Sequence, residues 1–286
     1  MTAEVVHDAV ARALAEDLDE RGDVTAALID EEVQGSLRIV ARHDGVVAGS
    51  ACAIAAFNLV DPDLVVNWIV SDGGRFANGT VIAEVAGCFR SMLTAERTAL
   101  NFLGHLSGIA TLTAAFVDAV HAVNPNCQVL DTRKTTPQLR VLEKAAVLAG
   151  GGTNHRMGLS DAVLIKDNHL GALSITEGVE RSKQLNPQLD VEVECDTLNQ
   201  AVEAVAAGAE AVLLDNMTPA QVSDCVAAIR SNGGETTRIE VSGGVTLATA
   251  PLLAAAGPDC ISVGALTHSS VVADFGLDLI RQEVGS

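Results

Sequence analysis

Short apolar stretches alternate with longer Ala-rich stretches from about residue 127 onward. Each short stretch reads as a buried strand and ends at a polar residue or a glycine; they are 127–131, 161–165, 189–195, 209–215, 238–242 and 259–264. The stretches between them have helical spacing, and several open at a Thr and close at a Gly. This alternation predicts successive strand–helix units that build a parallel sheet.

The chemistry at the strand ends favours one of the two architectures that such units allow. Charged or hydroxyl side chains follow nearly every strand, as at Lys166, Glu194, Asp215 and Ser242. In an α/β barrel all of these ends meet at one mouth, whereas a doubly wound sheet concentrates its ligand contacts at one switch point. We therefore predict an α/β fold with an irregular barrel over residues 110–270.

Residues 1–109 have a different pattern. Their strand-like segments are joined by Gly- and Asp-containing turns and are flanked by helical patterns at 3–18 and 92–106. We predict an α+β domain with an antiparallel sheet here. The tail 271–286 is too short for a domain of its own, and we expect it to return to residues 1–109.

Composition and charge narrow the class of protein. Hydrophobic residues make up 48% of the chain but aromatic residues only 2%, so Ala, Val and Leu must build the core. This suits helices packed on a buried parallel sheet. The formal net charge of −19 leaves no basic stripe for a phosphate backbone, and we expect no nucleic-acid partner.

Cysteine usage and the N-terminal segment indicate the compartment. Six cysteines are scattered without C-x-x-C spacing, which suits small buried residues in a reducing environment. The N-terminal segment is charged and amphipathic, unlike a signal peptide, and no uninterrupted apolar run reaches the length of a membrane span. We expect a cytoplasmic protein without a membrane partner.

One segment runs against the acidic character of the chain. Residues 133–166 hold six of its 18 Lys and Arg residues but only two acids. Arg133 and Lys134 directly follow a strand, and His155 and Arg156 follow a run of three glycines. Such a cluster predicts a pocket for a small ligand with several negative charges. Two other cations of the segment, Arg140 and Lys144, fall on a helical pattern, where we expect a supporting role.

Lys166 admits two interpretations at its strand end. It can bind a phosphate or a carboxylate, or it can form a Schiff base as in barrel aldolases. Glu194 and Asp215 end the next two strands and can hold Mg²⁺ on a phosphorylated substrate, or merely neutralise the cations. Glu192 and Glu240 share the inward-facing parity of Glu194 and Ser242, which predicts a supporting place beneath the site.

Glycines end the last two strands. Ser242-Gly243-Gly244 and Gly264 offer backbone without bulky side chains, as in the phosphate site formed by the final strands of such barrels. Together they predict a phosphate cradle.

The motifs DTRKTTP, GGGTNHRMGLSD, LIKDNH, VEVE, LLDN, SGGV and SVGALTHS, in this order, closely resemble the quinolinate phosphoribosyltransferase family. The segments GDVT and LTAERTALNFLGHLSGIAT are also similar to it, so that the resemblance spans nearly the whole chain. It implies an irregular, about seven-stranded α/β barrel with an N-terminal α+β sandwich domain. It also implies a homodimer, in which each N-terminal domain covers the barrel mouth of the partner.

The resemblance assigns roles to residues of this chain. It implies that quinolinate is bound by Arg133, His155, Arg156 and Lys166, with Arg97 donated by the other subunit. Phosphoribosyl pyrophosphate (PRPP) and its Mg²⁺ fall to Lys134, Glu194 and Asp215, and the 5′-phosphate to Ser242, Gly243, Gly244, Gly264 and His268. The implied catalytic residues are Lys134, Lys166, Glu194 and Asp215.

The implied reaction converts quinolinate and PRPP to nicotinate mononucleotide, pyrophosphate and CO₂ in NAD biosynthesis. Its rivals are a related enzyme for another pyridine carboxylate, a Schiff-base aldolase using Lys166, and a non-catalytic sensor of phosphorylated metabolites. One position departs from the family pattern, because Gln138 stands where a Gly usually follows TTP. We expect the added side chain to alter the loop after Lys134.

Overall fold

The computed structural model describes residues 2–280. They form two compact units, each assembled from separate stretches of the chain. The first unit contains the residues up to Ala114, Thr136–Gly151 and the residues from Ser269 onward, and the second contains Ala115–Thr135 and Gly152–His268. The boundary expected between residues 109 and 110 falls inside helix α3 (Phe89–His121), which contributes to both units.

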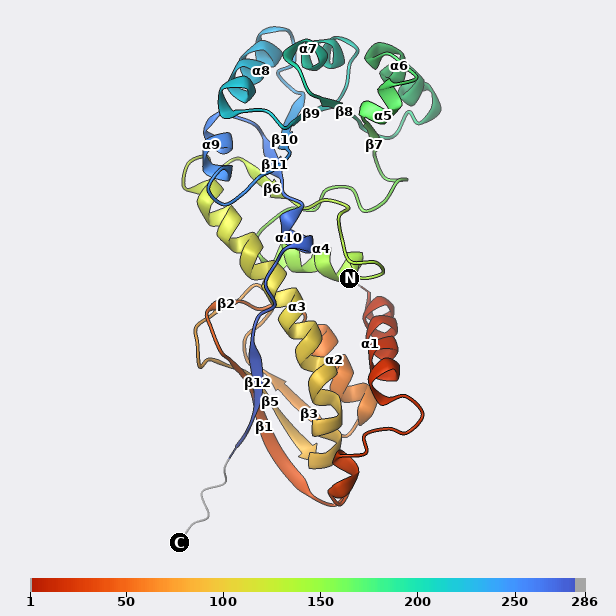
Figure 1. Ribbon diagram of the computed structural model, residues 1–286, viewed down its shortest axis with the longest axis vertical. Helices are drawn as coiled ribbons and strands as arrows, with labels where there is room; N and C mark the ends of the chain where they lie inside the picture. The colour runs from red at the N-terminus through yellow and green to blue at the C-terminus, as the bar shows by residue number, and fades with distance from the viewer. Residues whose placement is uncertain (1, 281–286) are drawn as a thin grey trace. The chain divides into compact units, whose positions relative to one another are not determined.

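The first unit is built on a four-stranded antiparallel sheet, as the sequence predicts (Figure 1). Its order is β12-β1-β5-β3, and the strands are β1 (Gln34–Ala41), β3 (Val65–Trp68), β5 (Val81–Cys88) and β12 (Phe275–Leu279). A separate short ladder joins β2 (Gly45–Val46) to β4 (Arg75–Phe76). The antiparallel part of the fold prediction is confirmed.

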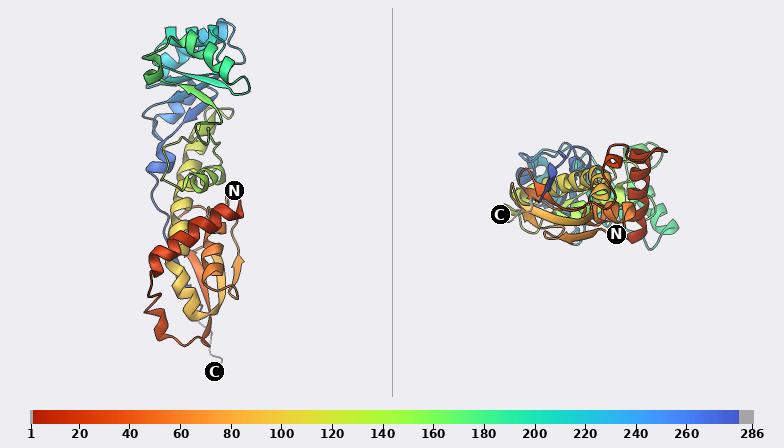
Figure 2. Two further views of the ribbon diagram at one scale, coloured as in Figure 1. Left: turned by 90° about the vertical axis from the view of Figure 1, so that its right-hand side faces the viewer. Right: turned by 90° about the horizontal axis from the view of Figure 1, so that it is seen from below.

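Helices cover one face of this sheet (Figures 1 and 2). They are α1 (Ala3–Leu18), α2 (Ser50–Val60) and the first part of α3; a short 3₁₀ turn spans Ala26–Leu28, and α4 (Arg140–Ala149) also belongs to this unit. In α1 the buried residues Val6, Val10 and Leu14 recur every fourth position, which places them on one stripe. This stripe is what α1 buries against the rest of the unit.

Helix α3 extends well beyond the predicted range 92–106. Gly104 and Gly108 continue the helical pattern. They have no side chain, and another segment packs closely against α3 at these positions. A Cβ on Gly108 would lie 2.2 Å from the carbonyl oxygen of Val271, and the amide of Ala273 donates to the carbonyl of Gly104. By length and composition α3 could cross a membrane, although 67% of its most apolar window is buried inside the protein, as in a core helix.

The segment after Ser269 joins the first unit. Strand β12 pairs with β1 in antiparallel register, from Leu37 opposite Leu279 to Ala41 opposite Phe275. This pairing lies within the tail 271–286, of which residues 281–286 fall outside the described part of the chain.

The second unit contains a six-stranded parallel sheet with the order β6-β11-β10-β9-β8-β7. All six strands coincide with predicted ones: β6 (Gln128–Leu130), β7 (Val163–Ile165), β8 (Val191–Cys195), β9 (Ala211–Asp215), β10 (Arg238–Ser242) and β11 (Cys260–Ser262). The prediction of a mixed α/β fold is confirmed.

The connecting helices follow the strands in sequence: α5 (Asp167–Leu170), α6 (Ile175–Leu185), α7 (Leu198–Ala206), α8 (Pro219–Ser231), α9 (Ala250–Ala255) and α10 (Ala265–His268). Reciprocal capping boxes open two of them, with Thr197 and Gln200 at α7 and Thr218 and Gln221 at α8. These are Thr caps of the kind that the sequence predicts. In Figure 1, α6, α7 and α8 lie outside the parallel strands.

The ladder continues past β6 through a single bridge. Leu130 forms a parallel bridge with Thr153, so that the segment after the three glycines lies beside β6 where a further strand would lie. Among residues 2–280 no bridge joins this segment to β7. Closure of the sheet into a seven-stranded barrel stays a prediction.

Gln138 occupies the backbone conformation that suits a glycine. Its φ is 67°, in the left-handed region, where the Cβ of an L-residue crowds the following carbonyl. The residue that departs from the family pattern therefore adopts a left-handed conformation, which adds backbone strain.

We expect Gln138→Gly to raise the free energy of unfolding by about 1 kcal/mol, since relief of left-handed strain outweighs the extra chain entropy of glycine. Thermal unfolding of the variant measures the gain. Gln138→Ala is the matched control, because alanine keeps the Cβ and the strain, and its midpoint should stay near that of the parent. A lower midpoint for Gln138→Gly would contradict this account.

Candidate active site

A cavity of about 570 Å³ opens at the carboxyl ends of the parallel strands of the second unit. Its lining contains every predicted site residue that the second unit carries: Arg133, Lys134, His155, Arg156, Lys166, Glu194, Asp215, Ser242, Gly243, Gly244, Gly264 and His268. Arg97 lies on α3 within the first unit. Sequence reasoning did not assign Thr132 and Ser262, which also line the cavity.

The parallel register explains why residues so far apart in sequence meet here. Glu194 of β8 lies opposite Leu213 of β9, and Asp215 lies opposite Ser242 of β10. Because side chains alternate along a strand, the residues that end these strands point to the same side. The sheet therefore brings the cations, the carboxylates and the glycines to one edge.

Arg133 and Arg156 form the strongly cationic part of the cavity wall. Burial first, and then the positive charge of Arg133, lower the pKa of Arg156. A guanidinium does not give up its proton in a protein, so this mutual repulsion remains as unfavourable energy. An anion bound between the two arginines would relieve it. Arg156 is held by its Nη1, which donates to the carbonyl of Ala162 at 3.3 Å.

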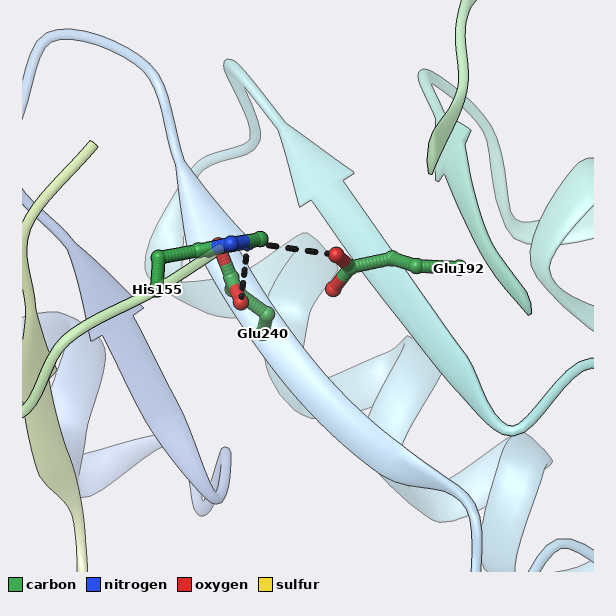
Figure 3. A group of neighbouring side chains, drawn as sticks. All are labelled: His155, Glu192 and Glu240. Carbon is green, nitrogen blue, oxygen red and sulfur yellow. Dashed lines mark ion pairs between the residues drawn. The ribbon is translucent and has the colours of Figure 1, made fainter. Parts of the chain in front are cut away.

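His155 is enclosed by two buried glutamates (Figure 3). Its Nε2 lies 3.2 Å from Glu192 Oε2 and 3.4 Å from Glu240 Oε2, and the two carboxylates are 4% and 0% exposed. Glu240 also accepts a hydrogen bond from the Ser262 hydroxyl, and Arg238 lies 3.6 Å from Glu192. The inward-facing glutamates thus lie beneath the cavity, as their strand parity suggests.

These buried groups share their protons unevenly. Burial, opposed by the His155 hydrogen bond and reinforced by the charge of Glu192, raises the pKa of Glu240. Burial also acts to raise the pKa of Glu192, but the hydrogen bond and charge of His155, with Arg238, lower it overall. Glu240 is therefore the carboxyl that holds a proton more readily.

The tautomer of His155 follows from its hydrogen bonds. Burial disfavours the charged ring, but Glu192 and Glu240 outweigh it and raise the pKa of His155 to about 9. Charging the ring would put a second hydrogen on Nδ1, where the Arg156 amide already donates at 2.7 Å. Because Nε2 faces the two carboxylates, it carries a hydrogen whether the ring is neutral or charged.

This assignment also bears on metal binding by the same cluster. The candidate ligand atoms of His155, Glu192 and Glu240 lie within 4.8 Å of one another. A metal ion would need the lone pair of Nε2, which carries a hydrogen in either form of the ring. We interpret the group as a proton-sharing cluster.

Glu194 and Asp215 are the residues that fit Mg²⁺. They end adjacent strands and line the same cavity, and their carboxylate oxygens are the donors that Mg²⁺ prefers. Glu194 forms an ion pair with Lys166, and Asp215 accepts from Asn216 Nδ2 at 2.5 Å. A site with two protein carboxylates leaves the remaining positions to waters and to the phosphates of a substrate.

Glycines shape the opposite wall of the cavity. Gly243 and Gly244 both have positive φ, at 93° and 58°, which suits only glycine well. A Cβ on Gly264 would lie 3.0 Å from the side chain of Lys134 and 3.2 Å from His268. Because Gly264 has no side chain, Lys134 and His268 can approach the wall where a phosphate would lie.

Parallel strands, a cationic cavity, a carboxylate pair and a glycine cradle at one sheet edge define an enzyme of the α/β class that handles anionic, phosphorylated substrates. Two family models match this chain: quinolinate phosphoribosyl transferase, N-terminal domain, over residues 23–107, and quinolinate phosphoribosyl transferase, C-terminal domain, over residues 109–278. The chain belongs to the quinolinate phosphoribosyltransferase family.

Individual relatives agree with the family match. A probable nicotinate-nucleotide pyrophosphorylase [carboxylating] of Synechocystis is 42% identical, over 94% of this chain and 90% of its own. The corresponding protein of Mycobacterium leprae is 40% identical over 96% and 98%. The solved nicotinate-nucleotide pyrophosphorylase of Francisella tularensis superimposes with a TM-score of 0.93 at 36% identity, covering 98% of both chains.

The raised pKa of Glu240 predicts how stability depends on pH. The folded protein keeps this proton to higher pH than the unfolded chain, so the free energy of unfolding falls as pH rises above the usual glutamate range. Glu240→Gln cannot titrate. We expect the thermal midpoint of this variant, relative to that of the parent, to rise between about pH 5 and about pH 9.

Thermal unfolding across this pH range checks the sign of the effect. The exposed Glu235→Gln is the matched control and should follow the parent at every pH. A midpoint difference for Glu240→Gln that shrinks with rising pH would show that Glu240 is not the proton-holding carboxyl.

Proposed function

We propose that this protein is a decarboxylating quinolinate phosphoribosyltransferase, which converts quinolinate and PRPP to nicotinate mononucleotide, pyrophosphate and CO₂. The observation that carries this proposal is the pair of mutually repelling arginines, Arg133 and Arg156, in one cavity with a glycine cradle and a carboxylate pair. A pyridine dicarboxylate supplies two negative charges that can bind between these arginines. The names of the relatives, carboxylating nicotinate-nucleotide pyrophosphorylases, support the same reaction.

The pyridine acid binds on the cationic side of the cavity. Arg133 and Arg156 receive its carboxylates, because a planar guanidinium can make two parallel hydrogen bonds to a carboxylate. Lys166 lies where this side meets the acidic side and forms an ion pair with Glu194. The clamp orients the ring nitrogen toward the anomeric carbon, which turns an encounter of two substrates into a positioned attack.

PRPP binds on the opposite side. The 5′-phosphate lies at Ser242, Gly243, Gly244 and Gly264, with His268 beside it, and the pyrophosphate faces Lys134. Glu194 and Asp215 would hold Mg²⁺ on this side of the cavity, and the ion would supply charge stabilisation for the pyrophosphate leaving group. Lys134 stabilises the same developing charge as the C1–O bond breaks, and its loop is fixed by the Thr267 hydroxyl, which donates to the Lys134 carbonyl at 2.7 Å.

Loss of CO₂ follows glycosyl transfer. The bond between C2 and its carboxylate breaks, CO₂ leaves, and the electron pair remains on C2, next to the positively charged ring nitrogen. C2 then takes a proton from water. The acidic cluster of Glu192 and Glu240 beneath the cavity limits how strongly the cations can hold the departing carboxylate, because it offsets part of their charge.

A homodimer completes the site in this proposal. Arg97 on α3 reaches the cavity of the partner subunit, as the resemblance implies, and adds a further cation for quinolinate.

The six cysteines are all free among the described residues, which supports a cytoplasmic location.

The rival activities fit the site less well. A Schiff-base aldolase needs a lysine that is free to attack a carbonyl, whereas Lys166 forms an ion pair with Glu194. A sensor of phosphorylated metabolites has no need for Glu194, Asp215 and the arginine pair together. An enzyme for a pyridine monocarboxylate has less need for two arginines at the cavity wall.

The direct test is release of CO₂ from quinolinate labelled at the 2-carboxylate. We expect release that depends on PRPP and Mg²⁺, stops with EDTA, and matches the pyrophosphate formed. Nicotinate in place of quinolinate should form no mononucleotide. Equal turnover of nicotinate, or no release of labelled CO₂ by the folded protein, would refute the proposal.

Mixing two inactive variants tests the shared site. Arg133→Ala should raise the KM for quinolinate at least about tenfold, since it removes a charge-assisted contact, and Arg97→Ala should impair the neighbouring site. In a heterodimer of the two, one site carries both defects and the other carries neither. Mixing should restore part of the activity. Verified heterodimers that regain none would contradict the donation of Arg97.

A further inference from the structure

Asp131 lies fully buried at the end of β6, directly before the loop of Arg133 and Lys134. Its Oδ1 accepts the His155 amide at 2.9 Å, and its Oδ2 accepts Asn154 Nδ2 at 2.6 Å. Neither sequence pattern nor resemblance gave this residue a role. One buried carboxylate thus joins the two loops that carry the cationic clamp.

The backbone strengthens the same junction. The amide of Asp131 donates to the carbonyl of Thr153 at 3.2 Å, and the amide of Thr153 donates to the carbonyl of Val129 at 2.8 Å. These bonds place the segment before His155 alongside β6. They fix its position along the strand, whereas the Asp131 carboxylate fixes the direction in which the chain turns after Thr153.

His155 transmits this order to Arg156. Its amide is held by Asp131, its Nε2 faces Glu192 and Glu240, and its Nδ1 accepts the Arg156 amide at 2.7 Å. All three polar groups of His155 are therefore engaged inside the protein. The cation that this loop offers to the cavity is the guanidinium of Arg156.

We propose that Asp131 is a positioning residue for quinolinate: through the loop of His155 it holds Arg156 at the spacing from Arg133 that a pyridine dicarboxylate requires, without contacting the substrate itself. This inference rests on the proposed function and deepens it, since it adds a residue that acts through the clamp. Buried donors that lose their acceptor destabilise the arrangement they belong to, so removal of Asp131 displaces the loop.

Calorimetric titration of quinolinate measures the effect on the clamp. Asp131→Ala leaves two partly buried donors without this acceptor and should weaken the Kd about tenfold. Asp131→Asn keeps an oxygen for the His155 amide, and Asn154 can rotate to meet its amide group, so most of the affinity should return. The KM for PRPP should change less than about twofold in both variants. The exposed Asp224→Asn on α8 is the control and should bind as the parent does.

A double-mutant cycle with Arg156→Ala distinguishes positioning from an independent contribution. If Asp131 acts through Arg156, the double variant Asp131→Ala/Arg156→Ala binds no more weakly than Arg156→Ala alone. Three results would overturn the proposal. The first is a loss of affinity in the double variant equal to the product of the losses in the two single variants. The others are a Kd for Asp131→Ala within twofold of the parent, or an equal loss of PRPP binding. If Asp131→Ala does not fold, Asn154→Ala removes one of the two contacts of Asp131, and the same double-mutant cycle with Arg156→Ala tests the proposal.

A parent protein that releases no CO₂ from quinolinate would refute the proposed function instead, so the two failures are distinguishable.

Discussion

Repulsion between like charges at one edge of a parallel sheet is the constraint on which this site depends. Arg133 and Arg156 are brought together by two separate loops, and the chain is otherwise strongly acidic. Such an arrangement persists only where the fold holds it rigidly and where a ligand relieves it. The buried hydrogen bonds at Asp131, the sheet register and the acidic cluster beneath the cavity are the means by which this fold holds its cations in place.

The charges around the cavity also bear on the loss of CO₂. Cations that bind a carboxylate tightly also stabilise it against leaving as CO₂. Glu192 and Glu240 lie almost fully buried behind His155 and make the floor of the cavity acidic while its walls are basic.

Strand positions and strand-end residues could be predicted from the sequence because they follow from local apolar periodicity. Glu194, Asp215 and Ser242 were found in this way, and the family motifs supplied the loops. The partners of His155 could not be predicted, since Glu192 and Glu240 reach it only through the register of neighbouring strands. The full length of α3 was missed because its glycines look like breaks until the segment near Val271 packs on them. The expected effect of Gln138 on its loop stays a prediction; its φ of 67° lies in the left-handed region.

The pairing of β1 with β12 has a consequence for how the protein is made. Strand β1 leaves the ribosome early, but its partner on one side is encoded close to the end of the chain. Until then β1 presents an open strand edge, with backbone donors and acceptors available to any other extended segment. Completion of the sheet must wait until β12 has been synthesised, so we expect the nascent chain to depend on chaperones more than the folded protein does.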